Sequence, residues 1–262
     1  MTTLLIAIAD KKDLDRLLPP ARTLAKAFNH KILISTFHDK TQTIKQLCQA
    51  SAGHHELKSS ANNLVSTITG LTDSREYDIS IVLIPESVID LERKRKATKF
   101  LSAFRKLKVP YLIMPESIPP EWKPTHIFFP VSLREGDKET AAWAGFLTRY
   151  HNSNLRLLYP GFKSPEDQKR LWVVLLFIQR LFERSNIHFE TLKKGHHKRE
   201  LLDSTIAIAN ETPTSLIVVP ATRFYSPEYY FTGSPEFKLL KNRGNTPVLF
   251  VNPRHDLYVP CG

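Results

Sequence analysis

Residues 81–85 read Ile-Val-Leu-Ile-Pro, and residues 216–220 repeat the pattern as Leu-Ile-Val-Val-Pro. Both runs are short, apolar and rich in β-branched residues. They lack the alternation of a strand with one face in water, so they are typical of strands covered on both faces. The stretches around them carry helical spacing. Buried parallel strands separated by helices predict an α/β fold.

The other apolar runs repeat in the same order. Residues 3–115 and 125–253 can be laid over one another, and the repeated order predicts two tandem copies of one domain, each with a parallel sheet. The matching runs are 4–9 with 127–131, 32–34 with 155–158, and 109–115 with 246–253.

Proline marks the boundary between the copies. The stretch between them can form neither a helix nor a central strand, because it contains Pro115, Pro119, Pro120 and Pro124. We therefore expect a divergent first domain over residues 1–117 and a second domain over residues 124–254.

Composition indicates a globular protein. The 262 residues are 42% hydrophobic, and the longest apolar run, 171–178, is far shorter than the roughly 20 residues of a membrane-spanning helix. The N-terminal run has no preceding basic region, so a signal peptide is not expected. Two cysteines, Cys48 and Cys261, suggest no redox or metal site. A cytoplasmic protein without a membrane segment is expected, and its net charge of +11 attracts anionic partners in general.

Helix signals occur at two places. Pro19 and Pro20 predict the start of a helix that reaches Phe28, because proline is tolerated in the first turn and not deeper. Ser164 followed by Pro165 predicts a capped helix to Arg184. Apolar residues nearly encircle that second helix, which is therefore either a deep core helix or one that is also covered by the other copy or another chain.

The element order resembles that of a universal stress protein domain, and the whole chain resembles a tandem member of that family. In the second copy the resemblance extends over residues 125–253, including the strand at 216–219, Gly233-Ser234 and the closing run at 247–251. It implies two Rossmann-like domains, each a five-stranded parallel sheet with helices on both faces. No enzymatic reaction is generally assigned to such domains.

Some members of this family bind ATP through Gly-x2-Gly-x9-Gly-Ser/Thr after the fourth strand. In the second copy Gly233 and Ser234 match the end of this motif, whereas Pro220 and Arg223 replace its first two glycines. Proline removes both an amide donor and the backbone freedom of glycine. In the first copy Pro85 and Val88 take the two positions, and no Gly-Ser pair follows.

The acid that the family places after its first strand is Asp10 in the first copy and becomes Ser132 in the second. We therefore expect degenerate nucleotide sites and no bound cofactor. The alternative is a nucleotide or another phosphate compound held by Ser132, Arg223, Gly233 and Ser234 of the second copy, with Asp10 as the corresponding residue of the first.

The densest basic segment is 93–96, over a predicted apolar helix stripe, and it is continued by Lys99, Arg105, Lys106 and Lys108. A solvated helix face is the favoured interpretation, and contact with nucleic acid or an acidic partner is the alternative. Nucleic-acid contact is not favoured because no aromatic residues are interleaved with these cations. The aromatic residues between Arg223 and Gly233 are expected to fill the emptied nucleotide cleft, or else to form a partner surface. They are Tyr225, Tyr229, Tyr230 and Phe231.

The sequence contains no arrangement of residues that predicts a catalytic site. The pairs His54-His55 and His196-His197 lack other ligands at metal spacing and are expected to be exposed loop residues. The sequence thus predicts a non-enzymatic stress-response protein that acts through a protein partner or self-association. Nucleic acid is the less favoured partner, and no membrane contact is expected.

Overall fold

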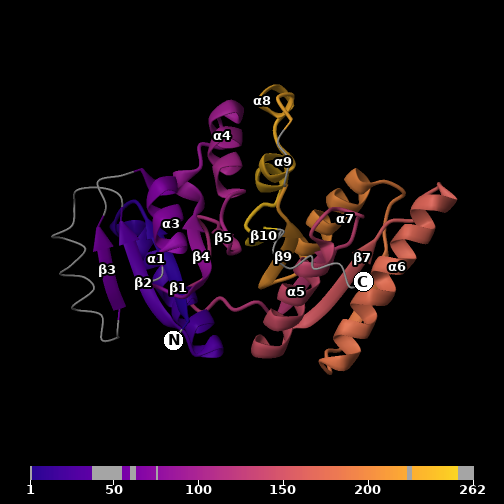
Figure 1. Ribbon diagram of the computed structural model, residues 1–262, viewed down its shortest axis with the longest axis horizontal. Coiled ribbons are helices and arrows are strands. Elements are labelled where there is room, and N and C mark those ends of the chain that lie inside the picture. The colour runs from indigo at the N-terminus through magenta and orange to yellow at the C-terminus, as the bar shows by residue number, and fades with distance from the viewer. Residues whose placement is uncertain (1, 37–54, 60–62, 75, 223–225, 253–262) are drawn as a thin grey trace. The chain divides into compact units, whose positions relative to one another are not determined.

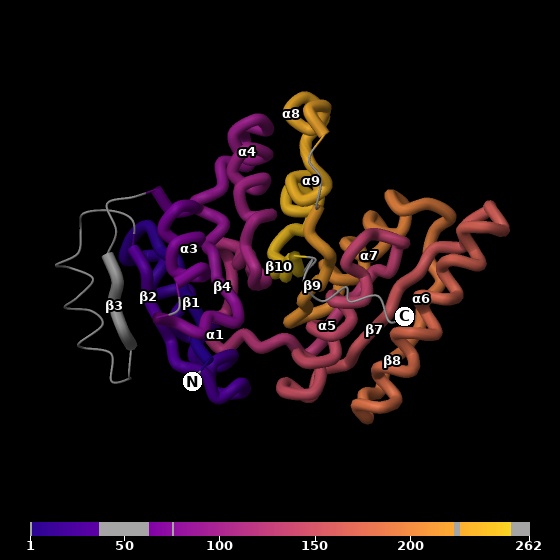
Figure 2. Tube along the Cα trace, viewed as in Figure 1, coloured from indigo at the N-terminus to yellow at the C-terminus, as the bar shows by residue number. Residues whose placement is uncertain are grey.

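The computed structural model describes residues 2–36, 55–59, 63–74, 76–222 and 226–252. Figure 1 shows the helices and strands, and Figure 2 traces the same chain as a tube. The chain forms two compact units. Unit 1 comprises Met1–Lys123 with Ser226–Phe237, and unit 2 comprises Pro124–Tyr225 with Lys238–Gly262. Residues 226–237, expected in the second domain, therefore group with the first copy.

A parallel sheet with the strand order β3-β2-β1-β4-β5 forms the centre of unit 1. All residues of β1 are buried, and because successive side chains point to opposite faces, both faces of the strand are covered. The strands are β1 (Thr3–Ile8), β2 (Lys31–Thr36), β3 (His55–Ser59), β4 (Ile79–Pro85) and β5 (Tyr111–Met114).

Helix α1 packs against β1, β2 and β4 and corrects the predicted helix start. It begins at Lys11, so Pro19 and Pro20 lie inside it. Each proline costs an intrahelical hydrogen bond, but α1 buries a continuous apolar stripe, and Asp10 caps its first turn. The helices of unit 1 are α1 (Lys11–Phe28), α3 (Leu64–Asp73), the 3₁₀ turn η1 (Glu86–Val88), α4 (Lys94–Phe104) and α8 (Tyr229–Thr232).

Unit 2 repeats the arrangement with the strand order β8-β7-β6-β9-β10, also parallel. The run at 216–220 lies in β9, which is completely buried, as its sequence predicts. The strands are β6 (His126–Pro130), β7 (Asn154–Tyr159), β8 (Phe189–Lys193), β9 (Ser215–Pro220) and β10 (Val248–Val251).

The long helix α6 has the bounds that the sequence predicts, with Ser164 as its N-cap. The interpretation of α6 as a deep core helix is wrong, because only Leu171, Ile178 and Phe182 are buried. In α7 the buried residues are Leu201, Thr205, Ile206 and Ala209. The helices are α5 (Asp137–His151), α6 (Pro165–Arg184) and α7 (Lys198–Glu211), followed by α9 (Pro235–Asn242). Among the described residues, no helix has both the length and the apolar character needed to cross a membrane.

Candidate functional site

The strand order locates the place where a sheet of this kind accepts a ligand. In open parallel sheets, ligands bind beyond the carboxyl ends of the strands, at the point where the strand order reverses. That point lies between β1 and β4 in unit 1 and between β6 and β9 in unit 2. The residues that directly follow these four strands therefore decide what each unit can bind.

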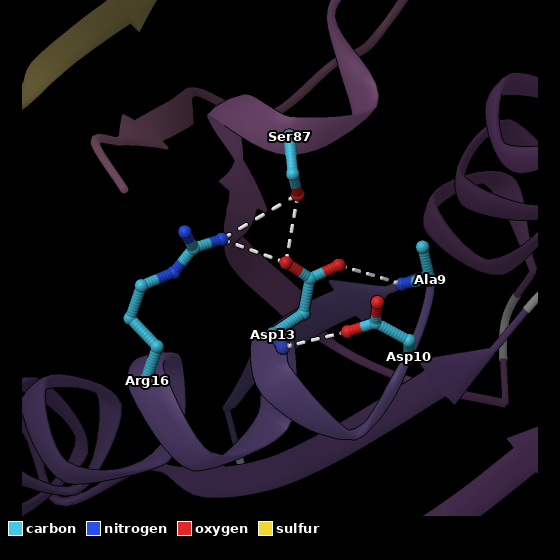
Figure 3. Close-up of polar contacts among 5 residues, drawn as sticks. All are labelled: Ala9, Asp10, Asp13, Arg16 and Ser87. Carbon is cyan, nitrogen blue, oxygen red and sulfur yellow. Dashed lines mark hydrogen bonds and ion pairs between the residues drawn. The ribbon is translucent and has the colours of Figure 1, made fainter. Parts of the chain in front are cut away.

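In unit 1 the residues beside this position contact one another through the buried carboxylate of Asp13, and Figure 3 shows these contacts. Asp13 Oδ1 accepts hydrogen bonds from Ser87 Oγ at 2.7 Å and Arg16 Nη2 at 2.7 Å. Its Oδ2 accepts the amide of Ala9 at 3.0 Å. Asp10 caps α1 by accepting the amide of Asp13 at 2.9 Å. Asp10, which the sequence analysis named, and Asp13, which it did not, thus both accept hydrogen bonds from other groups of unit 1.

The Asp13 contacts join the two strand ends. Ser87 belongs to η1, directly after β4, so its hydroxyl connects the β4 end to the first turn of α1. The side chain of Asp13 is only 4% exposed, and that of Arg16 is 16% exposed. Hydrogen bonds to a charged group contribute about 1.5–3 kcal/mol each, and breaking a buried ion pair leaves an uncompensated charge. A phosphate entering here would meet a carboxylate whose partners are already engaged.

In unit 2 a buried carboxyl occupies the start of α5, with a different set of partners. Asp137 Oδ2 accepts the amides of Ser132 at 3.2 Å and Arg134 at 3.1 Å. Its Oδ1 is buried and has no hydrogen-bond partner among the described residues. Burial raises the pKa of Asp137 to about 7, although the two amides and the charges of Arg134 and Lys198 act in the opposite direction.

The strand ends of unit 2 are joined by a cation. Arg134 Nη2 donates to Thr222 Oγ1 at 2.9 Å, which connects the loop after β6 to the segment after β9. Ser132 itself is buried, and its amide is bound to Asp137. The sequence therefore identified Ser132 correctly as a residue after the first strand, whereas Arg134 and Asp137 were missed.

Prolines end both β4 and β9, at the positions of the first motif glycine. Pro85 has φ −72°, and it leads directly into η1. Pro220 pairs with Val251 in the sheet, and the next amide, that of Ala221, donates to Val251 O at 2.8 Å. The backbone here continues the strand pairing, so it offers no glycine loop to a phosphate.

Gly233 and Ser234 serve the packing of unit 1. Gly233 has φ +80°, and a Cβ there would lie 2.6 Å from Phe237 Cδ1. Ser234 Oγ accepts the amide of Phe237 at 3.2 Å, which caps α9, and its own amide donates to the buried Thr98 Oγ1 of α4 at 3.4 Å. Ser132 belongs to unit 2 and Arg223 lies outside the described residues, so a site that joins all four residues stays a prediction.

The aromatic residues before Gly233 differ from the favoured expectation. Phe231 is 68% exposed and Tyr230 is 39% exposed, so the prediction that they fill a cleft is wrong for these two rings. Tyr225 lies outside the described residues. The open alternative, a partner surface, agrees with their exposure.

Histidines are held by local contacts. His196 Nδ1 lies 3.1 Å from Gly161 O, and its amide donates to Glu200 Oε2 at 2.6 Å. That hydrogen bond, together with His197 and His196, lowers the pKa of Glu200. Within the described part of the chain, no group of three or more His, Cys, Asp or Glu residues is arranged to hold a metal. His54 and the side chain of His55 lie outside that part.

Comparison with protein-family models gave no match, and a search of curated proteins gave none. Among solved structures, a universal stress protein from Archaeoglobus fulgidus is similar over 97% of both chains, with a TM-score of 0.68 and 11% identity. The cytoplasmic domain of a prokaryotic cation chloride cotransporter is similar over 96% of this chain and 95% of that one, with a TM-score of 0.57 and 13% identity.

The chain therefore belongs to the α/β class with two parallel, Rossmann-like sheets. Its fold is that of a tandem universal stress protein, which confirms at the level of the fold the resemblance found in the sequence.

Proposed function

We propose that this chain is a non-enzymatic, cytoplasmic stress-response protein of the universal stress protein type, which acts through contacts with another protein. The observation that carries the proposal is the closed ligand position of unit 1. There Asp13 Oδ1 accepts hydrogen bonds from both Ser87 and Arg16, which joins the ends of β1 and β4. In unit 2 the pair Arg134–Thr222 joins the corresponding strand ends.

A protein-contact role is supported by the outward face of α6. Four apolar side chains stay exposed on it, although the opposite side of the helix is buried. They are Trp172 at 64%, Val173 at 60%, Leu176 at 45% and Phe177 at 42% exposure. Contiguous apolar patches of this kind on a soluble domain mark binding surfaces, because leaving them in water costs about 25 cal/mol per Å².

The fold comparisons are compatible with such a role. The same fold is found in a domain of a larger protein, the cation chloride cotransporter. A fold alone does not assign a function, so the proposal depends on the closed strand ends and on the exposed face of α6.

Calorimetric titration of the full chain with Mg-ATP tests the first part of the proposal. We expect no saturable heat in the micromolar range. Stoichiometric micromolar binding would instead favour the alternative, a phosphate-ligand site in the second domain. An Arg134→Ala variant is the matched probe, because it removes the hydrogen bond to Thr222. Nucleotide binding gained only in this variant would support closure by Arg134.

Site-specific photocrosslinking in cells tests the second part. A photoreactive phenylalanine analogue replaces Phe177 on α6 or, as a control, Arg199 on α7, whose side chain is 93% exposed. We expect a discrete crosslinked species at position 177 that is absent at position 199. Its mass distinguishes a partner protein from a second copy of this chain. Equal patterns at both positions would contradict a contact role for α6.

A further inference from the structure

The first turn of α4 carries an unusual concentration of positive charge. Residues 93–115 contain eight lysines and arginines and no acid. Arg93, Lys94, Arg95, Lys96 and Lys99 are all exposed. The first turn of α4 contains no acidic residue, and no side chain caps it. Cations at the positive end of a helix dipole lower its stability, so fold stability does not explain this arrangement.

Within the described residues, two of these eight cations have an acidic partner, Arg93 with Asp90 and Lys108 with Asp73. Arg93 lies 3.6 Å from Asp90 across an exposed surface, a pair of small energetic value. Lys96 and Lys99 have no acidic partner among the described residues. The nearby acid on the α8 side is Glu228, which is exposed and directly precedes that helix. The surface of α4 therefore has a net positive charge that complements a polyanion.

Folding brings an aromatic ring into this basic surface. Lys94 Nζ donates to Phe231 O at 3.1 Å, and the Arg95 guanidinium carbon lies 5.1 Å from the centre of the Phe231 ring. These contacts lie within unit 1, since it includes both α4 and residues 226–237. Figure 1 accordingly shows α8 beside α4. The segment after α8 is also held to α4 by the buried hydrogen bond from the Ser234 amide to Thr98 Oγ1.

The exposed ring is the informative feature. Phe231 is 68% exposed and Tyr230 is 39% exposed, so both offer ring faces to a ligand next to the cations. Alternating cations and exposed aromatic rings are what single-stranded nucleic acid requires, because phosphates pair with the cations and unstacked bases stack on the rings. An acidic peptide would pair with the cations of α4 but would offer no flat base to stack on the ring of Phe231.

We propose that the α4–α8 surface binds single-stranded nucleic acid without sequence preference. This surface consists of Arg93, Lys94, Arg95, Lys96, Lys99, Tyr230 and Phe231. The sequence alone disfavoured nucleic acid because no aromatic residue is interleaved with 93–99, and folding supplies that missing element from α8. The surface is separate from α6 and does not depend on the protein-contact role proposed above.

Fluorescence anisotropy with a labelled 20-nucleotide single strand, titrated with the full chain at several salt concentrations, tests the proposal. We expect saturable binding at low salt that weakens steeply as salt rises, by a log–log slope of about 0.7 per phosphate contact. Phe231→Ala should weaken binding about 5- to 100-fold with an unchanged salt slope. Lys99→Ala should weaken it and reduce the slope by about 0.7.

The matched control is Phe177→Ala, which removes an exposed ring from α6 and should leave binding unchanged. Because Phe231 lies at the surface, its replacement leaves the fold intact, and circular dichroism checks this. Absence of binding at low salt would overturn the proposal. So would equal affinity for a duplex of the same length or for polyglutamate, or an unchanged affinity of the Phe231→Ala variant, since each would reduce the interaction to unspecific charge attraction.

Discussion

The buried carboxyl of Asp137 makes the stability of unit 2 depend on pH. Its Oδ2 accepts two amides, its Oδ1 has no partner among the described residues, and burial raises its pKa to about 7. Asp137→Asn is the informative change, because the amide keeps one oxygen for the two backbone donors and never ionises. The variant therefore imitates the protonated acid at every pH.

The magnitude follows from linkage between protonation and folding. The native pKa of about 7 lies above the ordinary pKa of 3.8 that this carboxyl has in the unfolded chain. The native state therefore binds the proton more tightly, so this contribution is complete below pH 3.8 and is lost as pH rises through 7. The difference between these two pKa values corresponds to about 4 kcal/mol of stability, of which about 2–3 kcal/mol is lost between pH 5 and 8.

Urea denaturation at half-unit pH steps measures the effect. We expect the free energy of unfolding of the unmodified chain to fall by about 2–3 kcal/mol relative to Asp137→Asn between pH 5 and 8. The control Asp203→Asn removes one carboxylate whose side chain is 63% exposed and should follow the unmodified chain. Parallel curves for the unmodified chain and Asp137→Asn across this range would refute the argument.

Four further changes test the packing, each by chemical denaturation at neutral pH. Asp13→Ala leaves the Ala9 amide and Arg16 without their acceptor and should cost about 3 kcal/mol. Gly233→Ala, with φ +80° and a Cβ 2.6 Å from Phe237, should cost about 2 kcal/mol, whereas Gly70→Ala in α3, with no atom within 4 Å, should stabilise by about 0.5–1 kcal/mol. Ser164→Ala removes the α6 cap and should cost about 0.5–1 kcal/mol.

The elements could be predicted where local signals agree. The buried strands read as apolar runs, and α6 has a serine cap followed by proline and acids, so both were located closely. Helix α1 was given the wrong start because Pro19 and Pro20 were weighted as helix boundaries. The cap at Asp10 and the apolar stripe beyond it favour a longer helix, and tertiary burial outweighs the hydrogen bonds that the prolines remove.

The site could be predicted only in part, because its contacts join residues distant in the chain. Asp10 and Ser132 were located since they follow the first strand of each copy. Ser87 and Asp13 are 74 residues apart, and only the parallel pairing of β1 with β4 brings them together. Lys94 and Phe231 are 137 residues apart, and their contact depends on where residues 226–237 pack. No local pattern contains that information.

The two copies place an acid at a similar position, but different residues join their strand ends. In each, an acid in the first turn of the first helix accepts an amide from the preceding loop, Ala9 in unit 1 and Ser132 in unit 2. In unit 1 the other oxygen of Asp13 also holds Ser87 and so closes the strand ends with an acid. In unit 2 Arg134 makes that connection, and Asp137 Oδ1 has no hydrogen-bond partner within the described part of the chain. A ligand that displaced either contact would remove a charge-assisted hydrogen bond, worth about 1.5–3 kcal/mol or one to two decades of affinity. These different connections in the two copies are the reason that we propose binding through the exposed faces of α6 and of α4 with α8.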